Sequence, residues 1–161
     1  MTVLSLLVLT SINTASATEV GSRQFGLGVV LGDPTGLSAK LYLGGPTNAV
    51  DFALAFDTYS NNGNTNGWMY FHATYLIHPS VLAKPQGFEM PWHVGVGGYV
   101  LSDEFQNSND RDAFGVRVPI GLDFNLDEVP LQFFGDIALR VNLFPDTDID
   151  FDLGIGARYY F

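Results

Sequence analysis

The sequence predicts an all-β fold, an eight-stranded antiparallel up-and-down transmembrane β-barrel that follows an N-terminal signal peptide. Three observations lead to this prediction. Segment after segment alternates between apolar and polar or small residues, which is the period of a β-strand. The apolar rows are continuous and end in aromatic residues, whereas the alternate rows hold glycines and isolated charges. An apolar exterior around a polar interior is typical of a membrane barrel and is the inverse of a soluble sandwich.

The first two predicted strands form a hairpin. Alternation runs from Phe25 to Leu31 and resumes from Leu37 to Leu43. Between them, the sequence DPTG at 33–36 predicts a tight turn, because proline presets φ and glycine accepts a positive φ. The sequence GGPT at 44–47 then ends the second strand.

The next three predicted strands have less regular connections. The third covers 50–57 and leads into a polar loop at 60–67. The fourth covers 68–78 and is followed by a long connection, 79–90, in which we expect room for a helical turn. The fifth covers 92–100.

The remaining connections are polar and rich in turn-forming residues. A loop at 102–112 precedes the sixth predicted strand, 114–124, and a turn at 127–130 precedes the seventh, 131–143. Residues 144–148 lead into the last strand.

The last predicted strand, Ile149–Phe161 (IDFDLGIGARYYF), shows the alternation most clearly. Its final aromatic residue resembles the end of the closing strand of bacterial outer-membrane proteins, which the barrel-assembly machinery reads. This resemblance implies an assembly signal at Tyr159 and Phe161. Aromatic residues near other predicted strand ends fit the girdles found at membrane interfaces; these are Tyr59, Trp68, Tyr75 and Trp92.

The first residues have the features of a signal peptide. Val3–Ile12 is an apolar run, and Ala15-Ser16-Ala17 supplies the small residues of a cleavage site. We therefore expect a signal peptide at 1–17 and a barrel domain at 18–161. The alternatives are a buried strand or a short membrane helix, but a spanning helix needs about 20 apolar residues.

An even number of strands places both chain ends on one side of the membrane, which we expect to be the periplasm. Backbone groups in lipid must all be paired, so the sheet is expected to close. The connections near Asp33, Ser60, Ser102 and Asp146 then face outward from the cell. Those near Gly44, Pro79 and Asp127 face the periplasm.

Composition narrows the classes of partner and cofactor. The net charge of −10 argues against nucleic acid, whose phosphates need a basic surface. The absence of cysteine excludes disulfides and thiolate-bound metals. No phosphate-binding loop, dinucleotide fingerprint or zinc-ligand spacing is present. We expect a monomer whose partners are outer-membrane lipid, lipopolysaccharide and, during biogenesis, the assembly machinery.

Several motifs also resemble a known group of proteins. They are Gly28-x-x-x-Gly32-x-Pro34-Thr35-Gly36-x-Ser38-x-Lys40, the sequence GVRVPIGL at 115–122, and the terminal GIGARYYF. Together they resemble small, largely uncharacterised bacterial outer-membrane β-barrel domains that are similar in layout to the OmpX and OmpA barrels. The resemblance implies the fold and the bacterial outer membrane, but no catalytic residues.

The inward-facing positions carry charges of both signs. The cations are Lys40, Arg117, Arg140 and Arg158, and the carboxylates are Asp51, Asp57, Asp123, Asp136, Asp150 and Asp152. The interior of an eight-stranded barrel is just wide enough to be filled by side chains, and a lone buried charge is costly. We therefore expect a plug of salt bridges; the alternative is a gated path for protons or small ions. The excess of carboxylates predicts either a protonated His72 or His93, or some acids in wet vestibules.

One acidic motif could bind a cation. Asp146, Asp148, Asp150 and Asp152 recur at every second position, which places them on one face of an extended chain. Hard cations take several carboxylate oxygens, so a weak Ca²⁺ or Mg²⁺ site is one hypothesis. The alternative is a solvated acidic rim in which Asp150 and Asp152 pair with arginines. No other cofactor is expected.

The histidines raise the question of an enzyme. Eight-stranded lipid A deacylases and palmitoyltransferases use His and Ser near the outer leaflet. Here His78 and His93 flank the connection expected on the periplasmic side, far from Ser60 and Ser102, whereas a nucleophile and its base must be within hydrogen-bond reach. We therefore expect a structural or surface-interaction role. The alternatives are a lipid-modifying enzyme, a narrow channel, or a secreted lipocalin-like barrel that binds a ligand.

Overall fold

The computed structural model describes residues 23–61, 64–102 and 112–161, and it describes only the backbone of 57–61 and 64–66. The signal peptide expected at 1–17 and most of the loop at 102–112 therefore lie outside the described residues. The strands are β1 (Phe25–Asp33), β2 (Gly36–Tyr42), β3 (Asn48–Asn61), β4 (Asn64–Ala83), β5 (Phe88–Ser102), β6 (Ala113–Leu126), β7 (Leu131–Phe144) and β8 (Ile149–Tyr160).

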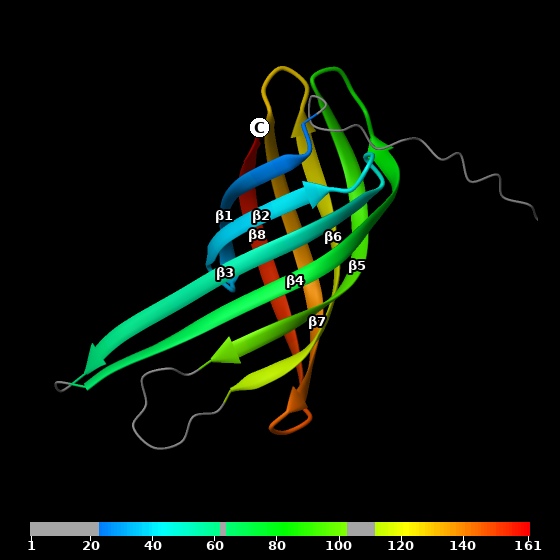
Figure 1. Cartoon of the computed structure of the whole chain (residues 1–161). Helices are drawn as coiled ribbons and strands as arrows, with labels where there is room; N and C mark the ends of the chain where they lie inside the picture. The colour runs from blue at the N-terminus through cyan, green and yellow to red at the C-terminus, as the bar shows by residue number, and fades with distance from the viewer. Residues whose placement is uncertain (1–22, 62–63, 103–111) are drawn as a thin grey trace, which may run out of the picture.

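Each strand pairs antiparallel with its neighbour in the chain, and β1 pairs with β8, so the sheet closes (Figure 1). The predicted eight-stranded antiparallel up-and-down barrel is confirmed. No helix in the described ranges is long and apolar enough to cross a membrane.

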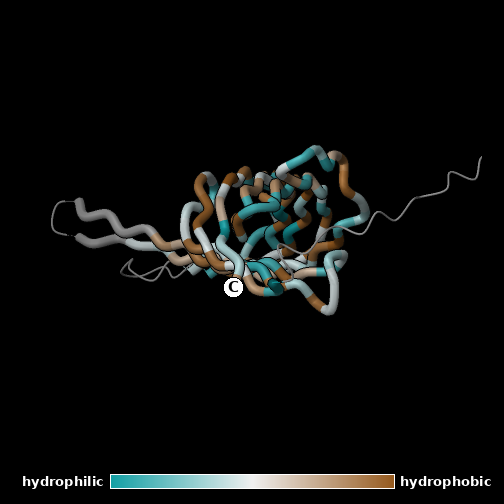
Figure 2. The backbone as a smooth tube through the Cα atoms, turned by 90° about the horizontal axis from the view of Figure 1, so that it is seen from above, coloured by the Kyte–Doolittle hydropathy of each residue, from teal (hydrophilic) through white to brown (hydrophobic). Residues whose placement is uncertain are grey.

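The alternation in the sequence becomes the two faces of the wall. On β8, Phe151 and Leu153 are 65% and 63% exposed, whereas Asp152 between them is fully buried. The other strands repeat this arrangement, and Figure 2 shows apolar and polar residues alternating along the wall of the barrel. Along the strands whose side chains are described, the residues predicted to face outward are the more exposed ones, because successive side chains of a strand point to opposite faces. Asp150, predicted to face inward, is instead exposed at the end of β8.

The long connection predicted at 79–90 is wrong. β4 continues to Ala83 and β5 begins at Phe88, so only 84–87 connect them, without a helical turn. The pairing of β4 with β5 shifts register between Ile77 and Ser80. A β-bulge tolerates a proline that a regular central strand would not, which explains how the strand passes Pro79.

The polar loop predicted at 60–67 is also mostly strand, since β3 runs to Asn61 and β4 starts at Asn64. β2 pairs with β3 only as far as Ala55, and β5 pairs with β4 only from Met69. Beyond those positions the two strands pair with each other alone, and this hairpin projects past the barrel wall (Figure 1).

The two ends of the barrel differ. We call the end that holds the C-terminus and the connections at 84–87 and 127–130 the terminal end. The opposite end holds the β1–β2 turn, the projecting hairpin and the 145–148 turn, and we call it the hairpin end (Figure 1).

Candidate functional site: the charged barrel interior

The interior is lined by ion pairs contributed by strands far apart in the sequence. Among the described side chains, four cations face four carboxylates inside the wall: Lys40, Arg117, Arg140 and Arg158 against Asp51, Asp123, Asp136 and Asp152. Of the other two carboxylates expected inside, the Asp150 side chain is 60% exposed and that of Asp57 lies outside the described part. Glu89 is a further buried carboxylate, paired with Lys84.

Arg158, on β8, occupies the middle of the barrel. Its guanidinium pairs with Asp51 on β3, donates to Ser38 Oγ at 2.9 Å and to Gln132 Oε1 at 3.2 Å. Its Cζ lies 3.6 Å from the centre of the Phe134 ring. A planar guanidinium with several fixed donors and an aromatic face is suited to such a buried position, where lysine could not satisfy the same partners.

Two arginines share one carboxylate nearer the hairpin end. Arg117 Nε donates to Asp152 Oδ2 at 3.3 Å, while Arg117 Nη2 donates to Asp136 at 2.9 Å. Arg140 Nε lies 2.8 Å from Asp152 Oδ1, close enough for an ion pair but out of line for a hydrogen bond. The rings of Tyr70 and Tyr99 flank Arg140, with centroids 5.9 Å and 5.5 Å from its Cζ.

The network reaches water at the hairpin end. Arg140 Nη2 lies 3.4 Å from Asp150 and 3.9 Å from Asp33, whose side chains are 60% and 66% exposed. Ion pairs at such positions contribute little to stability, because water and salt screen them.

A second, fully buried cluster lies toward the terminal end. Lys40 Nζ is 2.5 Å from Asp123 Oδ2 and 2.9 Å from His78 Nε2. His93 completes the cluster, with Nδ1 3.5 Å from Asp123 Oδ1. All four side chains are at most 2% exposed. From the sequence, His78 is expected beside a connection. The alternation that places Leu76 inward also places His78, two residues later, inside the barrel.

A polar layer covers this cluster on the side of the terminal end. Tyr160 Oη donates to Gln132 Oε1 at 3.0 Å, and Gln132 Nε2 donates to Asn125 Oδ1 at 2.7 Å. Tyr42 packs against Tyr160 with ring centroids 5.9 Å apart. Glu89, also buried, pairs with Lys84.

A small hollow lies between the ion pairs of the interior. It has a volume of about 10 Å³ and lies between the ion pairs of Asp51 and Arg158 and those of Arg117 and Asp136. That volume is about one water molecule by the usual measure. Charged side chains line this hollow together with Val30, Ala53 and Phe134.

The four carboxylates of the predicted row are not gathered around one point. No three of these aspartates, all of which the structure describes, bring ligand oxygens within 4.8 Å of one another. Asp152 is buried between two arginines, Asp150 is exposed beside Arg140, and Asp148 accepts a hydrogen bond from the Ile149 backbone amide. The period of two holds along β8, but Asp152 lies inside the barrel, whereas Asp146, Asp148 and Asp150 lie in solvent.

The histidines are not arranged as in a hydrolase. His72 contacts Tyr70 and Asp51, and His78 contacts Lys40, Asp123 and the Thr47 carbonyl. Within the part of the chain whose side chains are described, no histidine hydrogen-bonds a serine or threonine hydroxyl. Ser60, which sequence analysis considered, has no described side chain.

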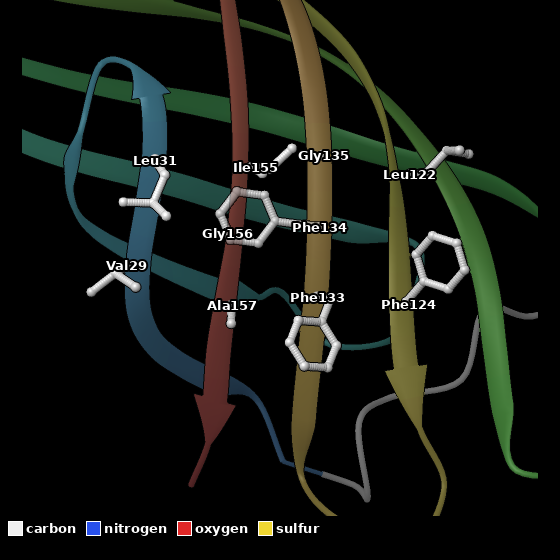
Figure 3. A pocket seen from close by; sticks show the side chains of 10 residues that line it. All are labelled: Val29, Leu31, Leu122, Phe124, Phe133, Phe134, Gly135, Ile155, Gly156 and Ala157. Carbon is white, nitrogen blue, oxygen red and sulfur yellow. The ribbon is translucent and has the colours of Figure 1, made fainter.

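A further hollow lies on the outside of the wall. It encloses about 550 Å³ over β1, β8, β7 and β6, and its lining is almost wholly apolar (Figure 3). Small residues at the centre, Gly135, Gly156 and Ala157, leave it open between larger ones such as Leu31, Phe124 and Phe133. Gly156 has a further role, since a Cβ there would lie 2.4 Å from the inward Phe134 ring and 2.3 Å from the Val29 carbonyl oxygen.

Comparisons with known proteins give one likeness of fold. No family model and no curated protein sequence matches the chain. Among solved structures, the crystal structure of the N-terminal beta-barrel domain of Pseudomonas aeruginosa OprF is similar, with a TM-score of 0.48 and 14% identity. The likeness covers 86% of this chain and 96% of that one.

Proposed function

We propose that the protein is an integral barrel of the bacterial outer membrane with a structural or surface-interaction role. The observation that carries this proposal is the inversion of the wall. Large apolar side chains on every strand are exposed, with Phe56, Phe151 and Leu153 above 60%, while charged side chains such as Lys40, Asp123 and Arg158 are buried inside. Soluble monomers rarely expose continuous apolar surfaces of this extent.

A surrounding lipid bilayer accounts for both the apolar outer face and the charged inner face of the barrel wall. The outward rows find an apolar solvent, and the closed sheet leaves no unpaired edge within the wall. The buried charges are paired with one another, which a barrel interior requires. The chain is proposed to be a monomer surrounded by outer-membrane lipids, including lipopolysaccharide on the outer side.

The packed interior favours a structural or surface role over transport. The hollow of about 10 Å³ beside Asp51 and Arg117 is too small for a hydrated ion. The β3–β4 hairpin is the part of the described chain that reaches furthest past the wall (Figure 1). It offers backbone edges at the hairpin end, which we place outside the cell, to other surface molecules.

The C-terminus fits an assembly signal. Phe161 is 65% exposed, its backbone amide donates to the Phe25 carbonyl at 2.9 Å, and its ring lies 5.1 Å from that of Tyr159. The last aromatic pair thus lies on the outer surface at the β1–β8 seam, where the barrel closes. An assembly machinery that closes barrels would meet these two residues there, and deletion of Phe161 is expected to reduce the barrel yield in cells.

The direct test is fractionation of bacterial cells that express the full chain. We expect the protein in the outer-membrane fraction, extractable only with detergent, and with different gel mobility before and after boiling. A soluble, monodisperse protein in detergent-free buffer would overturn membrane residence. Steady conductance in planar lipid bilayers would instead overturn the plugged interior and favour the channel.

A further inference from the structure

We propose that His78, His93 and Asp123 form a binding site for a borderline divalent transition-metal ion such as Zn²⁺, and that Lys40 occupies this site as a competing cation. His78, His93 and Asp123 each offer a ligand atom, and these atoms lie within 4.8 Å of one another. Among the described residues, no other group of His, Asp and Glu meets this condition. The proposal is independent of membrane residence.

The tautomer of His78 prepares one ligand. Its Nδ1 lies 3.2 Å from the Thr47 backbone oxygen. A carbonyl oxygen only accepts, so Nδ1 carries the proton and Nε2 of the neutral ring presents its lone pair to the cluster. A histidine whose far nitrogen donates to a backbone carbonyl is the usual arrangement of a metal ligand.

The acceptor atoms surround a position for a cation. His78 Nε2 lies 3.1 Å from Asp123 Oδ2, and two lone pairs this close need a positive group beside them. Lys40 supplies it, with Nζ 2.9 Å and 2.5 Å from these same two atoms. The His78 and Asp123 side chains are thus arranged around one positive charge, the ammonium of Lys40 on β2.

Lys40 contacts His78 and Asp123, but it does not provide a hydrogen-bond partner for His93. His93 is 2% exposed, and neither ring nitrogen has a hydrogen-bond partner in the described structure. The nearer oxygen of Asp123, Oδ1, is 3.5 Å from His93 Nδ1 and is also without a hydrogen bond. Buried polar atoms without partners are uncommon. His93 Nδ1 and Asp123 Oδ1, which face each other, therefore point to a missing ligand between them.

The spacing suits a tetrahedral ion. Bonds of 2.0–2.2 Å to nitrogen and oxygen imply ligand atoms about 3.3–3.6 Å apart in a tetrahedral site. His78 Nε2 lies 3.1 Å from Asp123 Oδ2, and His93 Nδ1 lies 3.5 Å from Asp123 Oδ1, so each histidine faces a different oxygen of the same carboxylate at about this spacing. Three protein ligands leave a fourth position open, and two imidazoles with one carboxylate select Zn²⁺, Cu²⁺ or Ni²⁺ over Ca²⁺ and Mg²⁺.

Lys40 makes the site conditional. Asp123 is the single carboxylate of the cluster, and Arg158 lies close enough to Lys40 for the two cations to repel. A divalent ion therefore binds only when the ammonium moves aside, toward the Tyr42 ring whose centroid is 5.2 Å from Nζ. Removal of this charge is expected to strengthen metal binding.

The test is Zn²⁺ and Co²⁺ binding to the untagged, full-chain protein in detergent micelles, by equilibrium dialysis and by Co²⁺ absorption. We expect one Zn²⁺ per chain in the wild type, at least tenfold tighter binding in Lys40→Met, and loss of binding in His93→Gln. His72→Gln is the matched control, since His72 is a buried histidine outside the cluster, and it is expected to bind as the wild type does. A boiled-versus-unboiled gel shift verifies that each variant is folded.

Three results would overturn the proposal. Binding that persists in both His78→Gln and His93→Gln would place the metal elsewhere on the protein. Binding by Lys40→Met alone would show that Lys40 is the permanent cation of the natural cluster. Absence of binding in both the wild type and Lys40→Met would leave a trapped water as the partner of His93.

Discussion

The two ends of the charged interior use the same chemistry under opposite conditions. Toward the terminal end, Lys40 and Asp123 have side chains at 0% exposure and are surrounded by histidines and tyrosines. At the hairpin end, Arg140 contacts Asp150 and Asp33, both of which are mostly in solvent. The difference teaches that burial, more than distance, decides what an ion pair contributes, because water offers a substitute partner only at the open end.

The largest effect is expected from Asp123→Ala. It leaves Lys40 buried without its carboxylate, and loss of one partner of a buried pair costs about 3–5 kcal/mol. Urea unfolding in detergent or lipid vesicles, followed by the gel shift, measures this change. Val118→Ala, on the outward face of the neighbouring part of β6, is the matched control with a cost below about 1 kcal/mol. Equal losses for the two variants would show that the cluster is hydrated.

Arg117→Ala is expected to rank second, with a loss of about 3 kcal/mol, the lower limit for a broken buried pair. Asp136 loses its partner, but Asp152 keeps Arg140. The unfolding free energy of this variant should lie between those of Asp123→Ala and Arg140→Ala. A loss as small as that of Val118→Ala would contradict the packed interior and would call for conductance measurements.

Arg140→Ala is expected to cost only about 1 kcal/mol, since the carboxylates that it leaves at the mouth are hydrated and Asp152 retains Arg117. The double variant with Arg117→Ala sharpens the comparison. Asp152 then has neither arginine, so the combined loss should exceed the sum of the single losses. Simple additivity would argue that the two arginines do not share this carboxylate.

Asp150→Asn is expected to have the smallest effect, below about 0.5 kcal/mol, because its side chain is 60% exposed. Any loss should disappear in about 1 M salt, where the screening length falls to about 3 Å. The loss from Asp123→Ala should persist in the same salt. A salt-resistant loss at Asp150 would mean that the mouth is closed to solvent.

The corrections share a cause. Pro79 and the Asn- and Gly-rich stretch at 60–67 have the composition of loops, and sequence analysis read them as such. In the barrel, β4 passes the proline at a bulge, and β3 and β4 stay paired with each other past the wall. At both places, pairing with a neighbouring strand outweighs the local loop propensity of the residues. Such pairing cannot be predicted from amino-acid composition.

The sequence by itself determined the strands, their inward and outward faces and the closed antiparallel barrel. The reason is that the period of two is local, since side-chain direction alternates from each residue to the next. The sequence also predicted inward positions for the charged residues, from which Asp150 departs because its side chain is exposed. Only the tertiary structure decided their partners: Arg158 reaches Asp51 across the barrel, and Asp152 rather than Asp150 is the buried acid. It alone gathered His78, His93 and Asp123 from three strands around Lys40. Such meetings depend on the register between strands and on the curvature of the closed wall, which no single segment of sequence specifies.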